Sequence, residues 1–263
     1  MLVWIKGAGD LASGIGLRLF RAHIQIVMTD LPEPTAVRRS VSFSEAIRLG
    51  TCEVEGVRAE RAETEEDVKR ILLEGHIPVI PDPESPIPRN LHPAAVVDAV
   101  IAKVNTGTRM DDAPCVIGVG PGFTAGVDCH AVIETKRGHT LGRVITEGSA
   151  IPNTGIPGNV GGFTTQRVLR ASKDGIFHPH KTFGDLVRKG DQVADVDGVP
   201  VYTEIDGMIR GMLQDGIRVH KGMKSGDVDP RGRKADYTTV SDKASAIGGG
   251  VLEAVLAFTG VLK

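Results

Sequence analysis

The chain has 263 residues, enough to bury a large core, and this length predicts two domains or one domain with an added module. Its 31 basic and 33 acidic residues nearly cancel, which argues against a broad nucleic-acid surface. We find no apolar stretch of bilayer length and no secretory signal, so we expect a cytoplasmic protein that binds neither nucleic acid nor membranes. The three scattered cysteines form no disulfide framework.

The N-terminal segment has the order strand, glycine turn, helix. Residues 2–5 are an apolar run, and residues 11–20 repeat apolar side chains at helical spacing. Between them, GAGDLA follows the G-x-G-x-x-A dinucleotide fingerprint, in which glycines and a helix N-terminus approach an anion. A second apolar run ends at Asp30, where an acid can accept hydrogen bonds from a ribose. The cofactor-binding residues predicted here are Gly7, Gly9, Asp10, Leu11, Ala12 and Asp30.

A plainer interpretation of this turn stays open. The glycines can serve only tight packing of strand against helix, with Asp30 capping the next turn. Asp10 suits the positive end of the helix dipole, but its charge would repel a pyrophosphate. Arg38 and Arg39 either meet a phosphate group or belong to an ordinary solvated helix face.

Further strand and helix signals follow in alternation. We expect a helix at 34–49, a strand at 54–57, a helix that starts after Thr64 and stops at Gly75, and a strand at 77–80. Residues 96–101 fit either a strand or a helix. Repeated βα units imply a parallel sheet covered on both faces. The fold class is therefore predicted as α/β, a Rossmann-like parallel sheet followed by a β-rich part.

The middle of the chain contains a second glycine loop and a candidate cluster of polar residues. An apolar run leads into Gly118, Gly120 and Gly122, which we expect to bind a cofactor through backbone N–H groups. Residues 128–135 and 141–145 then predict a hairpin. On its first strand Asp128, His130 and Glu134 share one face and are the predicted catalytic residues.

The chemistry of that trio is left open. Its carboxylates and imidazole suit a hard or borderline metal, an acid–base pair, contact with a ligand, or an ordinary half-buried strand, and we assign no metal site. Cys129 faces the other way and fits a small core residue better than a nucleophile.

The C-terminal half is rich in glycine and short strands. Residues 152–162 form either a shaped binding loop or a plain connection between domains. Near-repeats around 187–191 and 219–223 suggest a biotinyl/lipoyl-like flattened barrel, although the turn at 197–200 carries no lysine for a prosthetic group. For His178 and His180 we favour a surface turn, with a metal-binding role as the minor alternative. Three glycines then lead into a buried helix at 251–258.

These signals predict four segments. They are a Rossmann-like nucleotide-binding domain at 1–110, a glycine-rich hairpin and loop segment at 111–170, the barrel module at 171–235, and a C-terminal helix packing on the core at 236–263.

Several long motifs, in order, resemble a known family. They are GAGDLASGIGLRL, MTDLPEPTAVRRSVSFSEA, GVGPGFTAGVDCHAVIETKRGHTLGRVI, PNTGIPGNVGG, GDVDPRG and SDKASAIGGGVLEA. Together they are similar to YqeB-type proteins of the selenium-dependent molybdenum hydroxylase system. The N-terminal turn is also distantly similar to the Rossmann part of XdhC-type factors, although their cysteine motif is missing.

The resemblance implies an accessory or maturation protein of molybdenum hydroxylases that binds a nucleotide or phosphorylated cofactor, such as molybdenum cofactor. Two alternatives remain, an NAD(P)-dependent oxidoreductase and a non-catalytic scaffold that docks on a hydroxylase. The expected partners are a molybdenum hydroxylase or its cofactor and a small phosphorylated ligand. Whether the chain catalyses a reaction or forms a homo-oligomer is left open.

Overall fold

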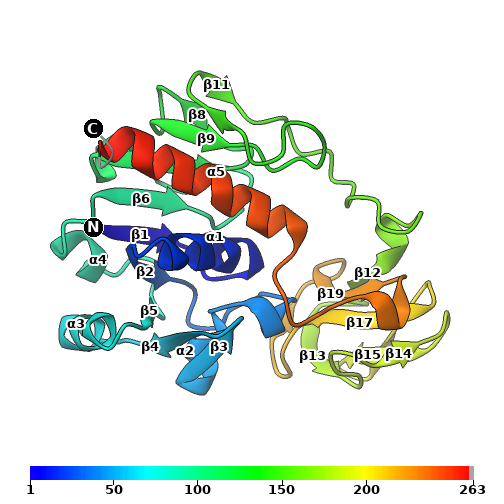
Figure 1. Cartoon of the computed structure of the whole chain (residues 1–263). Helices are drawn as coiled ribbons and strands as arrows, with labels where there is room; N and C mark the ends of the chain where they lie inside the picture. The colour runs from blue at the N-terminus through cyan, green and yellow to red at the C-terminus, as the bar shows by residue number, and fades with distance from the viewer. Residues whose placement is uncertain (261–263) are drawn as a thin grey trace. The chain divides into compact units, whose positions relative to one another are not determined.

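A computed structural model describes residues 1–260 and divides the chain into two compact units (Figure 1). Unit 1 consists of Met1–Pro34, Ser42–Asn153 and the chain from Val240 onward, and unit 2 of Thr35–Val41 and Thr154–Thr239. These units do not follow the four predicted segments. The chain leaves unit 1 after Pro34 and returns at Ser42, then leaves again after Asn153 and returns at Val240 for its last helix. Local sequence patterns do not reveal these crossings.

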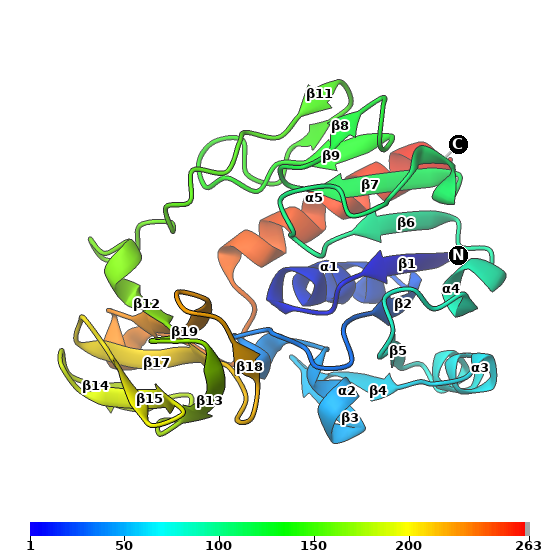
Figure 2. The same cartoon turned by 180° about the vertical axis from the view of Figure 1, so that it is seen from behind.

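Unit 1 is built on a nine-stranded sheet in the order β10-β9-β7-β6-β1-β2-β5-β4-β3. Strands β9 to β4 of this order run parallel to their neighbours, whereas β10 and β3 at the two edges are antiparallel (Figure 2). The strands are β1 (Leu2–Lys6), β2 (Gln25–Thr29), β3 (Thr51–Val54), β4 (Val57–Arg61), β5 (Ile77–Ile80), β6 (Ala95–Asp98), β7 (Cys115–Val119), β9 (Ala131–Ile133) and β10 (Val144–Ile145).

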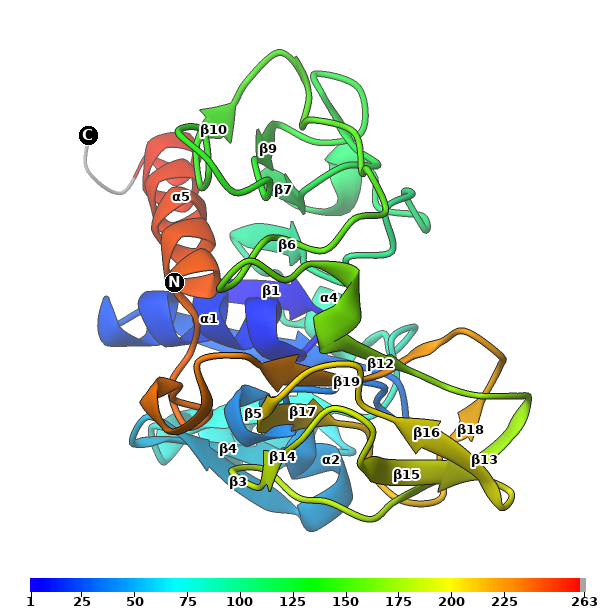
Figure 3. The same ribbon diagram turned by 90° about the vertical axis from the view of Figure 1, so that its right-hand side faces the viewer.

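Different elements pack against the two faces of the sheet. Helices α1 (Asp10–Arg21) and α5 (Asp242–Thr259) lie on one face, as the side view shows (Figure 3). On the other face Trp4, Val96 and Val116 join a buried cluster with Val68 and Ile71, because alternate residues of a strand point to opposite faces. Shorter elements complete the unit: α2 (Glu45–Leu49), α3 (Glu65–Leu73), α4 (Ile87–Asn90), the 3-10 turn η2 (Met110–Asp112), and the pair β8 (Thr124–Ala125) and β11 (Gly148–Ser149). The 3-10 turn η1 (Arg39–Val41) belongs to unit 2.

The three consecutive glycines near the C-terminus lie inside α5, not in a loop before it. Helices α1 and α5 approach so closely that a Cβ on Gly248 would meet the Gly14 carbonyl oxygen at 2.8 Å. A Cβ on Gly250 would lie 2.0 Å from the Gly142 oxygen. Glycine weakens a helix by about 1 kcal/mol relative to alanine, and here close backbone packing requires it.

Unit 2 contains short antiparallel strands in two four-stranded sheets, β12-β19-β17-β14 and β16-β15-β13-β18. Its core gathers apolar side chains such as Phe177, Val193 and Val228. The elements are β12 (Val168–Arg170), β13 (Gly175–Pro179), β14 (Leu186–Val187), β15 (Gln192–Val196), β16 (Val199–Tyr202), β17 (Gly207–Met212), β18 (Arg218–Val219), β19 (Lys224–Asp229), η3 (Thr165–Arg167) and η4 (Gly232–Lys234).

The predicted fold class, a Rossmann-like parallel sheet followed by a biotinyl/lipoyl-like barrel, is wrong. The large sheet is mixed, and the chain between β5, β6 and β7 has only α4 and η2 where repeated βα units would place full helices. The strands of unit 2 form separate antiparallel sheets. Apolar runs locate strands, but strand direction and sheet membership depend on long-range pairing. Among the described residues no helix is both long and apolar enough to cross a membrane.

Candidate functional site

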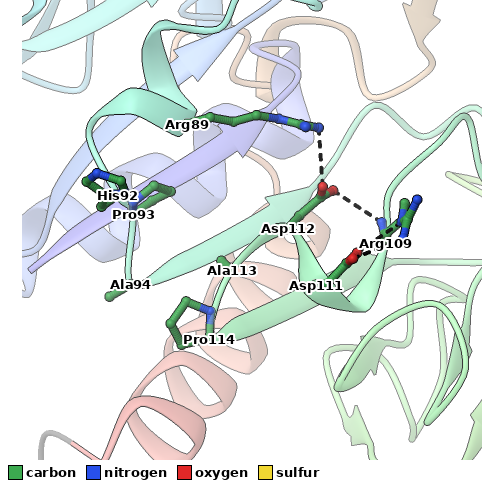
Figure 4. Close-up of a pocket in the computed structure, with 9 residues that line it drawn as sticks. All are labelled: Arg89, His92, Pro93, Ala94, Arg109, Asp111, Asp112, Ala113 and Pro114. Carbon is green, nitrogen blue, oxygen red and sulfur yellow. Dashed lines mark hydrogen bonds and ion pairs between the residues drawn. The ribbon is translucent and has the colours of Figure 1, made fainter.

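A cavity of about 570 Å³ opens in unit 1 (Figure 4). Its volume lies within the range of about 300–1,000 Å³ that is usual for small-molecule sites. Charged side chains and apolar ones share its wall. The lining residues are Arg89, His92, Pro93, Ala94, Arg109, Asp111, Asp112, Ala113 and Pro114.

Two connections that lead into neighbouring parallel strands form this cavity. Arg89 lies in α4, and residues 92–94 carry the chain from α4 to the start of β6. His92 has a positive φ of 48°, which ends α4 and turns the chain toward the sheet. Asp111 and Asp112 belong to η2, and Pro114 immediately precedes β7. The cavity therefore lies at the amino ends of β6 and β7.

Asp112 is the electrostatic centre of the wall. Its carboxylate accepts from Lys6 Nζ at 3.1 Å and from Arg89 Nη2 at 3.2 Å, and Figure 4 shows Arg89 and Asp112 pointing toward one another. The Asp112 and Lys6 side chains are only 5% and 14% exposed. Both cations also lie over the Trp4 ring, Lys6 at 5.0 Å and Arg89 at 5.8 Å from its centroid. The Arg89 guanidinium is thus held in place while its side chain stays 58% exposed.

Lys6 links this wall to a buried polar network. Its ammonium donates to Thr108 Oγ1 at 2.7 Å, and that hydroxyl donates to Asp98 at 2.6 Å. Asp98 is 2% exposed and also accepts from the Val100 N–H. Charge-assisted hydrogen bonds of this kind fix the connection between β6 and β7 against the carboxyl ends of β1 and β6.

The predicted residues missed this network. Lys6, Asp98 and Asp112 were not singled out, although Lys6 and Asp98 are each the one charged residue that closes an apolar strand. A charged residue at the end of an apolar strand is the sequence feature that could have identified Lys6 and Asp98 as candidates. Their hydrogen-bond partners lie 10 to 106 residues away, so spacing in the sequence does not indicate which side chains form hydrogen bonds.

The N-terminal glycine turn is occupied by the protein's own carboxylates. The Ala8 N–H donates to Asp30 Oδ2 at 2.7 Å, and the Leu11 N–H donates to Asp10 Oδ1 at 2.9 Å. Gly7 has a φ of +95° and lies so close to the chain after β6 that a Cβ would be 2.9 Å from the Ala99 oxygen. Of the predicted residues Gly7, Gly9, Asp10, Leu11, Ala12 and Asp30, therefore, Asp10, Leu11 and Asp30 make internal hydrogen bonds, and Gly7 packs against the chain after β6.

Burial raises the pKa of Asp30, with the Leu31 and Ala8 N–H groups acting in the opposite direction. Asp30 thus faces the glycine turn itself instead of a ribose. Of the two interpretations of this segment, the contacts fit tight packing with a capping acid.

The second glycine loop also serves packing. A Cβ on Gly118 would be 2.4 Å from the Phe123 ring, and one on Gly122 would be 2.7 Å from the Val104 nitrogen. Gly120 has a φ of +83° and its N–H donates to the Ile133 oxygen. In the described residues we find close chain contacts at Gly118, Gly120 and Gly122 rather than an open anion cradle.

The trio Asp128, His130 and Glu134 does not converge. Asp128 lies in the turn between β8 and β9, where it accepts from the Thr124 N–H at 2.8 Å and from Asn105. His130 accepts from the Val116 N–H through Nδ1, and its ring lies 6.0 Å from that of Phe258 in α5. Glu134 follows the opposite end of β9, about 13 Å further along an extended chain.

Glu134 is 2% exposed, and its two carboxylate oxygens accept from the Lys136 and Ile151 N–H groups. It therefore ties the β9–β10 hairpin to the following loop. β9 is only three residues long, and Asp128 lies in the turn before it. Backbone pairing does continue to Glu134, whose N–H donates to the Arg143 oxygen, but the three side chains bind different groups.

The cysteines are not nucleophiles in their folded positions. Burial raises the pKa of Cys52 and Cys115 to about 12 and that of Cys129 to about 11. Such thiols stay protonated at neutral pH and are unreactive.

One group of side chains in the described residues has metal-ligand spacing, Glu60, Glu74 and His76. Arg58 donates to Glu60 at 2.9 Å, and Arg70 donates to Glu74 at 3.1 Å. Burial raises the pKa of Glu60, but Arg58 and His76 outweigh it and the pKa is lowered. Two guanidinium groups already balance the two carboxylates, so this group fits a cation poorly.

No protein-family model matches the chain. The chain is 51% identical over 255 residues to the uncharacterized protein YqeB of Escherichia coli strain K12, covering 97% of this chain and 47% of that protein. The chain thus spans about half the length of this relative.

Three solved structures are weakly similar. A succinylglutamate desuccinylase/aspartoacylase from Rhodobacter sphaeroides is 25% identical with a TM-score of 0.21, covering 24% of this chain and 21% of that one. An aspartoacylase family protein from Mesorhizobium loti is 12% identical with a TM-score of 0.28, covering 86% and 84%. The ectoine utilization protein EutE (DoeB) from Ruegeria pomeroyi is 11% identical with a TM-score of 0.24, covering 77% and 57%.

These findings correct the predicted function. Two of the similar structures are described as aspartoacylases and the third as an ectoine utilization protein, and none is described as a molybdenum hydroxylase factor, an NAD(P)-dependent oxidoreductase or a docking scaffold. The predicted maturation role, its nucleotide or molybdenum cofactor ligand and both alternatives are therefore withdrawn. TM-scores this low transfer no activity from those enzymes to this chain. What the 51% identity does show is that this chain is similar, over nearly all of its length, to about half of the E. coli protein YqeB.

Proposed function

We propose that this chain binds a small organic carboxylate in the cavity at Arg89. The observation that carries the proposal is that the Arg89 guanidinium lies at the cavity wall, hydrogen-bonded to Asp112 and placed over the Trp4 ring. Among the described residues only its Nη2 makes a hydrogen bond, so its other N–H groups are available to a ligand.

Arginine suits this ligand class because its planar fork matches a carboxylate and forms two parallel hydrogen bonds. A second guanidinium is close by on Arg109, whose side chain is 73% exposed and pairs with the exposed Asp111. Exposed pairs of this kind are worth only about 0–1 kcal/mol, so an incoming carboxylate can replace Asp111 at little cost.

The remaining wall suits the carbon skeleton of such a ligand. Pro93, Ala113 and Pro114 present apolar surface, and small-molecule sites combine apolar walls with a few polar groups that fix orientation. The described lining contains no serine, threonine, cysteine or lysine. The proposal is therefore one of binding, and it makes no claim about the reaction of the longer relative.

Trp4 gives a direct test, since it is the single tryptophan of the chain and lies beneath Arg89. Succinate, glutarate and citrate would each be titrated into the protein while Trp4 fluorescence is recorded. We expect at least one to give a saturable change that Arg89→Ala abolishes. Arg58→Ala is the matched control, because Arg58 is also an ion-paired arginine of unit 1, 51% exposed, and does not line the cavity.

Two results would contradict the proposal. One is a saturable signal that survives Arg89→Ala, which would place the ligand elsewhere. The other is the absence of any change with all three carboxylates up to millimolar concentration.

A further inference from the structure

A pair of histidines on one strand of unit 2 forms a second chemical feature, independent of the cavity. His178 lies in β13, and His180 follows its last residue. The His180 N–H donates to the Val193 oxygen at 2.9 Å, which continues the β13–β15 ladder one residue past the strand. The assignment to a surface turn is therefore wrong for His178, whereas His180 lies in the bend that follows the strand. The alternation of an extended chain places the two imidazoles on the same face.

Asp195 of β15 lies on this same face. It is the register partner of His178, and directly opposed residues of an antiparallel pair point to one side. Its Oδ2 is 2.6 Å from His180 Nε2, and its Oδ1 accepts from the Gly198 N–H at 2.7 Å. The Gly198 N–H and His180 together lower the pKa of Asp195, so it stays a carboxylate.

Each imidazole is held by a carboxylate through one nitrogen. His178 Nδ1 is 2.7 Å from Asp215 Oδ1, and His180 Nε2 is 2.6 Å from Asp195. If these nitrogens carry the protons, the opposite nitrogens, His178 Nε2 and His180 Nδ1, hold lone pairs. Neither has a hydrogen-bond partner among the described residues.

This is the arrangement of metal-binding histidines, which donate their second N–H to a carboxylate that fixes tautomer and ring orientation. Both side chains are accessible, 46% exposed for His178 and 43% for His180. Two residues along a strand are about 6.6 Å apart at their backbones. An ion shared at about 2.0–2.1 Å from each nitrogen requires the two nitrogens within roughly 4 Å, so binding involves rotation of the two side chains from the positions described.

We propose that His178 and His180 bind one borderline divalent cation of the Zn²⁺ type, with Asp195 as the positioning residue that orients His180. Imidazole is a preferred ligand of Zn²⁺, whereas Mg²⁺ and Ca²⁺ prefer oxygen. Water completes the coordination at this exposed face.

The test uses the whole chain, stripped of metal with a chelator, and follows Zn²⁺ binding by calorimetry. We expect one Zn²⁺ per chain, with binding lost in His178→Ala and in His180→Ala. His220→Ala is the matched control, because His220 is an exposed histidine of unit 2, bonded to a backbone oxygen, that lies beside the start of β13 and not at the end that carries His178 and His180. His76→Ala removes the other group with ligand spacing and should leave Zn²⁺ binding unchanged.

Asp195→Asn separates a positioning role from direct ligation. We expect the stoichiometry to stay at one while the affinity falls about 10- to 100-fold. Imidazole ¹⁵N shifts of the wild-type protein check the site without any substitution, since Zn²⁺ should move the resonances of His178 Nε2 and His180 Nδ1. Undiminished binding by His178→Ala, loss of binding in His76→Ala, or no saturable Zn²⁺ binding by the wild type would each overturn the proposal.

Discussion

The Asp30 carboxylate accepts a hydrogen bond from the Ala8 N–H at 2.7 Å, so the end of β2 closes the glycine turn that follows β1. In a dinucleotide site that turn would face a pyrophosphate and the acid would face a ribose. Here the glycine turn and the Asp30 carboxylate bind each other. The contact explains how a segment can carry the fingerprint spacing and still serve the protein's own packing.

Asp30→Ala should destabilise unit 1, because the Ala8 and Leu31 N–H groups lose their shared acceptor. Leaving buried donors unpaired costs about 1–3 kcal/mol each, although partial exposure of this turn places the loss near the lower end. Chemical denaturation at pH 7 measures it. Asp30→Asn keeps one acceptor oxygen and should lose much less, so equal losses for both variants would contradict this account.

The stability of the wild-type protein and that of Asp30→Asn should also depend differently on pH. Burial raises the pKa of folded Asp30 above its unfolded value of 3.8. Its contribution to stability is therefore fully present below pH 3.8 and is lost as pH rises through the folded pKa. Asparagine does not titrate, so the stability of Asp30→Asn relative to wild type should increase over that interval. Denaturant midpoints of both proteins from pH 3 to pH 7 test the sign.

Local signals predicted several elements of unit 1 well. The helix after Thr64 is present as α3, with a capping box between Thr64 and Asp67, and the strand at 77–80 is β5. The helix expected at 34–49 is instead a loop with η1 and the short α2, because residues 35–41 leave for unit 2. Capping boxes and apolar runs act over a few residues, whereas that excursion depends on distant contacts.

The candidate site was less predictable than the fold. Lys6 meets Asp112 and Thr108, more than 100 residues away, and no spacing rule connects them. Asp128, His130 and Glu134 looked like a catalytic face because an eight-residue strand was assumed where β9 has three. In the structure each of the three side chains instead accepts from a different backbone N–H group, which the strand pattern alone could not show.

Glu134→Ala tests the structural role that replaces the catalytic one. Both carboxylate oxygens accept from backbone N–H groups in a buried position, so their loss should lower the free energy of unfolding by at least about 2 kcal/mol. Glu134→Gln keeps one acceptor and should lose roughly half as much. Thermal and chemical denaturation provide the measurement. Unchanged stability in both variants would return Glu134 to the set of functional candidates.

Adjacent glycines of α5 should respond in opposite directions to alanine. Gly250→Ala forces a Cβ against the Gly142 oxygen and should destabilise by about 1–3 kcal/mol. A Cβ on Gly249 meets nothing within 4 Å, so Gly249→Ala should gain up to about 1 kcal/mol from helix propensity. Unfolding midpoints of the two variants compare them directly. The same sign of change in both would mean that the α5 backbone does not pack as closely as the structure places it.

The ion pair of Lys6 with Asp112 should be energetically coupled to a degree that surface pairs are not. Its side chains are largely buried, and removal of one partner leaves the other charge with fewer compensating groups. A double-mutant cycle with Lys6→Met and Asp112→Asn should give a coupling of about 1–3 kcal/mol. Arg109→Met with Asp111→Asn is the control, because that pair borders the same cavity but is exposed, and its coupling should stay below about 1 kcal/mol. If the two cycles give the same coupling, Asp112 does not anchor the cavity wall, and Arg89 lacks the fixed orientation on which carboxylate binding depends.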